Sequence, residues 1–227
     1  MFMAVPPRYD LINRLFTWSL DERWRRQAAR ECLTGQPEQV LDLCCGTADL
    51  ALRLAGMLSG STRVLGIDFS LPMLKVAREK AEHSGMSDRI TLVHGDTASL
   101  PFPDEQFDCI GISFAFRNLT FKNPKALRYL TEVLRVLRPG GRFVIVESSQ
   151  PGSRLIRKLF HLYMRWYVSR LGHLLSGNRG AYRYLAESAS RFYTVEELRS
   201  LMIEVGFSQF LSRRLTFGAV AIHIATK

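Results

Sequence analysis

Between residues 39 and 149 the sequence alternates short apolar runs with longer segments that have the spacing of helices. Five of these runs are rich in Val, Ile and Leu: Gln39–Leu43, Arg63–Ile67, Ile90–Val93, Phe107–Ser113 and Arg142–Glu147. Because each run is apolar at nearly every position, it is typical of a strand that is buried on both faces, as in a parallel sheet. Strands that alternate with helices of this length predict βαβ units and a doubly wound α/β sheet.

Capping residues and glycines separate the predicted strands. Ser70, with Pro72 in the first turn, predicts a helix that ends near Gly85. Asn123 predicts the start of a second helix, which Pro139-Gly140-Gly141 stops.

The C-terminal part repeats this pattern. Thr194 and Glu197 have the spacing of a capping box, and Gly206 predicts the end of the helix that they open. Two final strands are expected over Phe207–Thr216 and Ala219–Ala225. The predicted sheet therefore has seven strands and is mostly parallel.

The segment Val40–Leu50 ends the first strand, turns, and begins a helix. Small residues in the turn let a ligand approach the backbone N–H groups of the helix N-terminus. Asp68 closes the second strand roughly 20 residues later, where a carboxylate accepts hydrogen bonds from a ribose diol. Asp96 and Thr97 follow the third strand, where an adenine amino group could bind. The alternative for the segment is an ordinary tight turn.

Gly46 is the single glycine of the turn, and no G-x-G-x-x-G motif is present. A pyrophosphate needs more exposed backbone than this turn offers, which argues against NAD and FAD. S-adenosylmethionine (SAM) has no phosphate and tolerates fewer glycines. The turn therefore favours SAM as the cofactor.

Several segments carry a more specific resemblance: Tyr9–Asn13, Leu41–Asp49, Leu100–Asp104, Phe107–Asn118, Arg135–Gly141 and Tyr182–Ser188. On these segments the chain resembles the ubiquinone/menaquinone-biosynthesis C-methyltransferases, which methylate the ring of prenylated benzoquinols or naphthoquinols. The resemblance implies a class I SAM-dependent methyltransferase that acts on a lipophilic prenylated quinol, most readily demethylmenaquinol. Two departures are Ala48, where the family's G-T-G-D has glycine, and a short lead-in before Tyr9.

The turn and the resemblance together give a set of expected SAM contacts: Asp42, Gly46, Thr47, Asp68, Asp96, Thr97 and Ser113. Arg117 is the candidate catalytic residue, since a guanidinium could stabilise a developing phenolate or position a water that takes the ring proton. It is too basic to be the base itself. The alternative for Arg117 is a salt bridge that holds the loop.

The candidate substrate contacts are Tyr9, Asn118, Tyr182 and Tyr184, with Asp10 beside the first of them. Ordinary packing or helix capping is the alternative for the tyrosines and for Asp10. His223 is a further candidate base, although a lone histidine in an apolar strand is more often structural. Cys44 and Cys45 are interpreted as small packing residues, and no metal site is expected.

The net charge of +10 favours acidic partners, and it is concentrated in one segment. Ser148–Ala186 holds seven Lys and Arg residues and no Asp or Glu. An amphipathic helix is expected there, with a membrane-surface contact through Arg154, Arg157, Lys158, Arg165 and Trp166. The alternative is a lid helix that covers the core, and both hold if the lid walls a tunnel for the prenyl tail. No run of about 18 apolar residues predicts a membrane span.

The chain is thus predicted to be a single domain with four parts. These are an N-terminal helical arm (1–37), a cofactor-binding core (38–149), a basic helical lid insertion (150–190), and a C-terminal helix with two strands (191–227). We expect a cytoplasmic protein, with peripheral attachment to the inner membrane face and homodimer formation left open.

Two rivals stay open. One is a methyltransferase for nucleic acid or another small lipophilic molecule, although Ser113-Phe-Ala-Phe stands where many DNA methyltransferases have a tetrapeptide such as Asn-Pro-Pro-Tyr. No nucleic-acid partner is expected, because no RNA or DNA module is present. The other rival is a non-catalytic scaffold that binds SAM or lipid.

Overall fold

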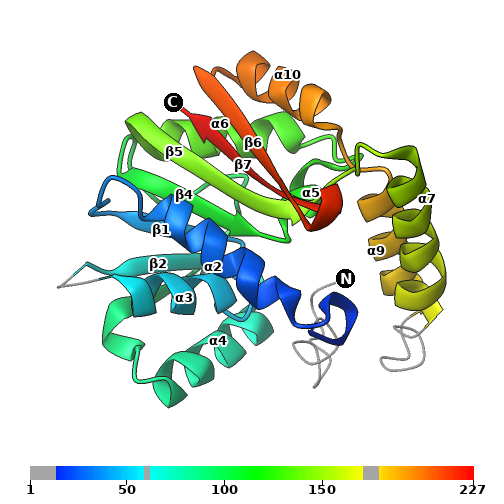
Figure 1. Ribbon diagram of the computed structural model, residues 1–227. Coiled ribbons are helices and arrows are strands. Elements are labelled where there is room, and N and C mark those ends of the chain that lie inside the picture. Colours follow the sequence, from blue (N-terminus) through cyan, green and yellow to red (C-terminus); the bar gives the residue numbers. More distant parts are fainter. Residues whose placement is uncertain (1–13, 59–61, 171–178) are drawn as a thin grey trace.

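Seven strands form one sheet in the order β3-β2-β1-β4-β5-β7-β6. The computed structural model describes residues 14–58, 62–170 and 179–227 (Figure 1). The strands are β1 (Val40–Leu43), β2 (Val64–Asp68), β3 (Ile90–His94), β4 (Phe107–Ser113), β5 (Leu137–Ser148), β6 (Gln209–Leu215) and β7 (Val220–Thr226). Strands β1 to β5 pair in parallel, and β7 runs antiparallel to β5 and β6. The seven-stranded, mostly parallel sheet predicted from the sequence is confirmed.

Helices cover both faces of this sheet (Figure 1). On one face, α2 (Leu20–Cys32), α3 (Asp49–Met57) and α4 (Leu71–His83) bury small and aliphatic side chains against β1, β2 and β4. On the other, α6 (Ala126–Val136) and α10 (Val195–Val205) pack on a core rich in Phe. Since the central strands are buried on both faces, their near-continuous apolar sequences follow directly.

The capping predictions held in part. Thr194 and Glu197 form the reciprocal capping box of α10, and Gly206 ends that helix with a φ of 115°. The predicted start of α6 at Asn123 was wrong, because the helix begins three residues later at Ala126. The Asn123 side chain instead accepts the Lys125 N–H at 3.0 Å, closing a turn before the helix.

The insertion after β5 forms a helical layer at one end of the sheet (Figure 1). Helix α7 (Arg154–Leu162) continues into a π-helical turn, η2 (Tyr163–Val168), which packs against α9 (Arg179–Ser190). A small apolar cluster joins them, with Met164, Val168 and Ala189 at its centre and Phe16 from the N-terminal segment beside them. No helix within the described ranges is long and apolar enough to cross a membrane.

Candidate active site

A cavity of about 900 Å³ lies at the carboxyl ends of the parallel strands. The ends of β1, β2 and β4 form its floor, and side chains from α2, η2 and α9 close it from the other side. In a doubly wound sheet this edge is the ordinary place for a ligand, since the strand order reverses between β1 and β4.

The turn after β1 takes an unusual backbone path along this edge. Cys44, Gly46 and Ala48 all have positive φ, of 53°, 54° and 63°. The Ala48 side chain is fully buried in the core on the α3 face and does not line the cavity. The family's usual glycine is therefore replaced by a residue that strains the backbone slightly without filling the cavity.

Asp42 anchors the turn from below. Its Oδ2 accepts the Ala51 N–H at 2.8 Å, and the residue is 1% exposed. Burial raises the pKa of this carboxyl to about 8, because a charged carboxylate is poorly solvated there. A cation placed beside Asp42 would stabilise its ionised form.

Asp68 ties the end of β2 to the same turn. Its Oδ2 accepts the Gly46 N–H at 2.9 Å and its Oδ1 accepts the Ser70 N–H at 2.8 Å. Burial raises its pKa, and these backbone hydrogen bonds oppose that rise. The carboxylate is thus held at the carboxyl end of β2, in the lining of the cavity.

The other predicted cofactor residues lie along the same edge. Asp96 Oδ1 accepts the Ala98 N–H at 2.9 Å, and Thr97 Oγ1 is 3.5 Å from Cys44 Sγ. Ser113 ends β4. All seven residues expected to contact SAM line the cavity: Asp42, Gly46, Thr47, Asp68, Asp96, Thr97 and Ser113.

Arg117 lies in the short helix α5 (Phe116–Thr120), just past β4, and also lines the cavity. Its Nη1 donates to Glu147 Oε1 at 2.5 Å, and its backbone N–H donates to Glu147 Oε2 at 3.2 Å. Glu147 is completely buried and also accepts from the Ser148 N–H and hydroxyl. The Nε of Arg117 is buried without a hydrogen-bond partner. The side chain is therefore both half of an ion pair and a donor that the protein leaves unsatisfied.

The predicted substrate contacts fall into two groups. Asn118 and Tyr184 line the cavity beside Arg117, and burial raises the pKa of Tyr184, which Arg117 partly offsets. Tyr9 and Asp10 lie outside the described residues, as does the side chain of Tyr182.

His223 lies away from the cavity, on β7. It is buried, its ring stacks on Phe210 with centroids 5.6 Å apart, and burial lowers its pKa to about 4. This placement favours the structural interpretation of His223 over a role as the base.

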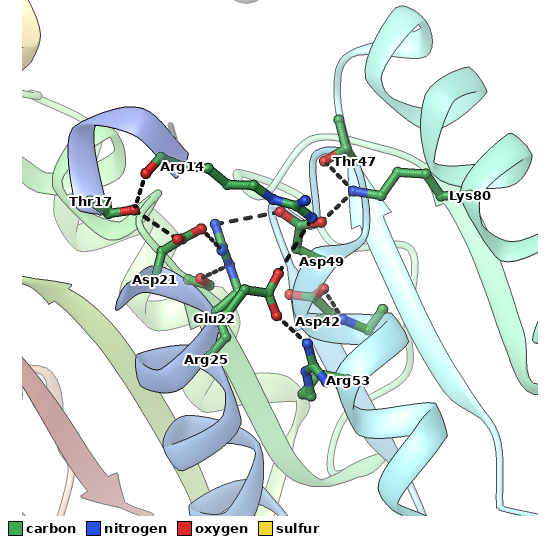
Figure 2. Close-up of polar contacts among 12 residues, drawn as sticks. Arg14, Thr17, Asp21, Glu22, Arg25, Asp42, Thr47, Asp49, Arg53 and Lys80 are labelled. Atoms are coloured by element: carbon green, nitrogen blue, oxygen red, sulfur yellow. Dashed lines mark hydrogen bonds and ion pairs between the residues drawn. The ribbon is translucent and has the colours of Figure 1, made fainter. Parts of the chain in front are cut away.

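Sequence reasoning missed Arg25, a buried residue of α2 that lines the cavity (Figure 2). Its Nη1 donates to Asp21 Oδ2 at 2.5 Å and its Nε donates to Ser113 Oγ at 3.1 Å. Its Nη2 lies 3.5 Å from Asp49 Oδ2, while Lys80 bonds the other oxygen of Asp49. The only signal in the sequence is the spacing of Asp21 and Arg25 by four residues, which is common on helices.

The cavity lining has two chemically different ends. Five carboxylates line one end in the described chain: Asp21, Asp42, Asp49, Asp68 and Asp96. The lining from the N-terminal segment and the lid, whose Tyr184 lies near Arg117, is largely apolar and aromatic: Phe16, Phe160, Met164, Val168 and Leu185. This acidic end suits a cationic nucleoside such as SAM better than the pyrophosphate of a dinucleotide.

Comparisons with known proteins agree with this geometry. A family model described as the ubiE/COQ5 methyltransferase family matches residues 1–227. Demethylmenaquinone methyltransferase of Thermus thermophilus is 43% identical over 227 residues, covering 100% of both chains. The ubiquinone/menaquinone biosynthesis C-methyltransferase UbiE of Geobacter sulfurreducens is 39% identical, covering 100% of this chain and 87% of its own.

Solved structures share the fold at low sequence identity. A SAM-dependent methyltransferase from Aquifex aeolicus superposes with a TM-score of 0.65 at 19% identity, covering 96% of each chain. A SAM-dependent methyltransferase from Thermotoga maritima gives a TM-score of 0.60 at 21% identity, covering 96% of this chain and 97% of its own.

Proposed function

This chain belongs to the ubiE/COQ5 methyltransferase family, and from that premise we propose that it methylates a ring carbon of a prenylated naphthoquinol, converting demethylmenaquinol to menaquinol. It is a SAM-dependent methyltransferase. The observation that carries the choice of acceptor is that the buried cation Arg117, near Tyr184 of the lid, lines the same cavity as the lid's aromatic and aliphatic side chains. A lipophilic ring fits the aromatic and aliphatic side chains, and its phenolate form fits the cation.

SAM, when bound, supplies an electrophilic methyl group on a sulfonium. Arg117 would hold the quinol oxygen as a phenolate, which makes the ring carbon a stronger nucleophile. Its Nε supports this role, since it is a buried donor without a partner in the structure. Glu147 fixes the guanidinium through Nη1. A ring carbon held in line with the methyl group then needs no covalent help from the protein.

Tyr184 would complete the acceptor site. Burial raises the pKa of its hydroxyl above the usual value, so the group stays neutral and can donate a hydrogen bond to the second quinol oxygen. The apolar side chains of η2 and α9 would accommodate the start of the prenyl tail. The ring proton leaves after the methyl group is bonded, and a water ordered by Arg117 or Asn118 can accept it.

We further propose that the outer face of α7 and η2 rests on an anionic membrane surface, from which the quinol enters. Exposed apolar side chains follow that face at spacings of four, three and four residues: Leu155, Leu159, Leu162 and Trp166. Exposed Arg154, Lys158 and Arg165 flank them. Cations for lipid phosphates beside side chains for the acyl region are typical of an interfacial helix.

Arg157 does not fit this face as well as its neighbours do. Its Nε donates to the Pro151 carbonyl at 2.8 Å and the residue is half-buried. We therefore assign Arg157 to the start of the lid and leave it out of the proposed membrane contact.

The acceptor is tested by incubating the protein with methyl-labelled SAM and a reduced, short-chain demethylmenaquinone. We expect label in the naphthoquinol ring, and none when menaquinol, which already carries that methyl group, replaces the acceptor. A demethoxyubiquinol-type acceptor tested in parallel distinguishes the two ring classes. Absence of label in every quinol would contradict the proposed function.

The membrane contact is tested by flotation with vesicles of phosphatidylcholine alone or with phosphatidylglycerol. We expect binding to the anionic vesicles, and a clear loss with Leu159→Gln. The matched control is Leu211→Gln, because Leu211 is at least as exposed as Leu159 and lies on β6, far along the chain from the lid. Equal binding by both variants would show that the lid face is not the contact.

A further inference from the structure

We propose that Arg25 binds the carboxylate of the methionine part of SAM. The inference rests on SAM as the cofactor and does not depend on which acceptor is methylated. Arg25 is a residue of α2, outside all the strand-end motifs, and it lines the cavity. Its guanidinium lies between Asp21 and Asp49 (Figure 2).

The strand order gives the direction in which the cofactor must extend. Asp68 ends β2, and Asp96 follows β3, so the nucleoside part belongs to the β2 and β3 side. In the order β3-β2-β1-β4 the cavity continues from there past β1 to the end of β4. The amino acid part therefore reaches the ends of β1 and β4, and Ser113, at the end of β4, is where Arg25 Nε donates.

The charges at this place call for a cation. Asp21 and Asp49 both line the cavity, so a carboxylate without a cation beside it would be repelled. Among the described residues that line the cavity, the two cations are Arg25 and Arg117. Arg117 pairs with Glu147 of β5, one strand beyond β4 and so farther from the β2 and β3 side, and Lys80, which bonds Asp49 and Thr47, is not part of the lining. Arg25 is the cation that remains for the methionine carboxylate.

The geometry of Arg25 leaves room for this ligand. Two of its nitrogens have short partners, Nη1 with Asp21 at 2.5 Å and Nε with Ser113 at 3.1 Å. The Nη2–Asp49 contact of 3.5 Å is longer than an ordinary N–H···O hydrogen bond. Asp21 and Ser113 thus orient the guanidinium, and Nη2 can turn to a carboxylate at the cost of one weak contact.

The experiment compares calorimetric binding of SAM with that of decarboxylated SAM, which differs only in lacking this carboxylate. We expect the unmodified protein to bind SAM about 10- to 100-fold more tightly, the range of a charged hydrogen-bonded pair. Arg25→Met with Asp21→Asn should bind the two ligands within about threefold of each other. The second substitution removes the buried carboxylate that Arg25→Met would leave unpaired.

Two control variants isolate the effect. Asp21→Asn alone keeps the guanidinium but removes one of the two groups that orient it, so its preference for SAM should lie between those of the parent protein and the double variant. Arg26→Met removes an exposed arginine from the same helix and should change neither affinity. If the double variant does not fold, Arg25→Lys keeps the charge with a single donor group, and its preference for SAM should fall by at least about threefold.

A preference for SAM that survives in the folded double variant, or in Arg25→Lys, would overturn the proposal, because the carboxylate would then bind elsewhere. Equal weakening of both ligands with the preference intact would show that Arg25 only supports the turn. Since no acceptor is added, these outcomes are independent of the quinol assays.

Discussion

Arg117 and Arg25, the two buried arginines that line the cavity, differ in the partners that hold them. Arg117 makes one compact ion pair with Glu147 and has a donor to spare. Arg25 belongs to a network that includes Asp21, Asp49 and, through Asp49, Lys80 (Figure 2). Arg117 lies near Tyr184 of the largely apolar lid, whereas Arg25 lies between two aspartates and against the ring of Phe114.

This contrast explains how one cavity can hold two unlike molecules. A cationic cofactor is stabilised by nearby carboxylates. The cofactor also carries a carboxylate of its own, which needs a guanidinium beside it. A lipophilic phenol gains from a single cation in apolar surroundings, where the charge is poorly screened. We therefore expect the cofactor among the aspartates and the phenol beside Arg117, with the end of β4 between them.

The largest expected effect on stability comes from removing the guanidinium of Arg117. Arg117→Met leaves the carboxylate of Glu147 buried and unpaired, so the free energy of unfolding should fall by about 3–5 kcal/mol. Adding Glu147→Gln should restore most of it. Urea unfolding of both variants measures these changes in stability. If Arg117→Met alone were as stable as the parent protein, the buried ion pair would be contradicted.

The cofactor end should respond to pH through Asp42. Its pKa of about 8 lies above the unfolded value of about 4, so the folded protein holds this proton and loses stability as pH rises from 4 through 8. A bound cation favours the ionised form, so SAM affinity should rise between pH 6 and 8, by at most about tenfold per pH unit.

Asp42→Asn should remove that dependence of SAM affinity on pH, which calorimetry at several pH values would reveal. It should also flatten the loss of stability with rising pH, by at most about 1.4 kcal/mol per pH unit. The same slope in both proteins would mean that another group titrates.

His223 does not line the cavity, so its substitution is a comparison for both ends of the cavity. Burial lowers its pKa to about 4, below the unfolded value of about 6.5, so stability should be lost as pH falls through this window. His223→Phe keeps the stacking on Phe210, should remove the acid sensitivity, and should leave methyl transfer unchanged. A large loss of methyl transfer in the folded variant would return His223 to the candidate bases.

The smallest effect is expected at Ala48. Glycine relieves the positive φ but adds freedom to the unfolded chain and deletes a buried methyl group, so Ala48→Gly should change stability by less than about 1 kcal/mol. SAM affinity should stay within about twofold, because the side chain does not line the cavity. Much tighter SAM binding would show that the methyl group crowds the cofactor.

Much of the fold and of the strand-end site could be predicted from the sequence. Apolar runs identify strands buried on both faces, and the carboxyl ends of parallel strands must meet at one edge, which brought Asp42, Asp68 and Ser113 together. Arg117 was found for the same reason, since it follows β4 directly.

Arg25 could not be predicted, because its role depends on contacts with Ser113 and Asp49, far away in the sequence. In the sequence it is one of several arginines on an amphipathic helix. The partial burial of Arg157 was missed for a related reason. The packing of α7 and η2 decides which cationic side chains are exposed to solvent. The helix start expected at Asn123 was too early, because an Asn side chain can accept a backbone N–H in a turn as well as at a helix N-cap.

The division of labour between the two arginines is tested most directly by single-turnover methyl transfer at saturating SAM, with a reduced demethylmenaquinone as acceptor. The Arg117→Met/Glu147→Gln protein should bind SAM within about threefold of the parent yet transfer methyl groups about 10²- to 10³-fold more slowly. The Arg25→Met/Asp21→Asn protein should need more SAM and then recover most of the parent rate. Recovery by the Arg117 variant at high SAM, or a rate in the Arg25 variant that stays equally low at saturation, would contradict the account.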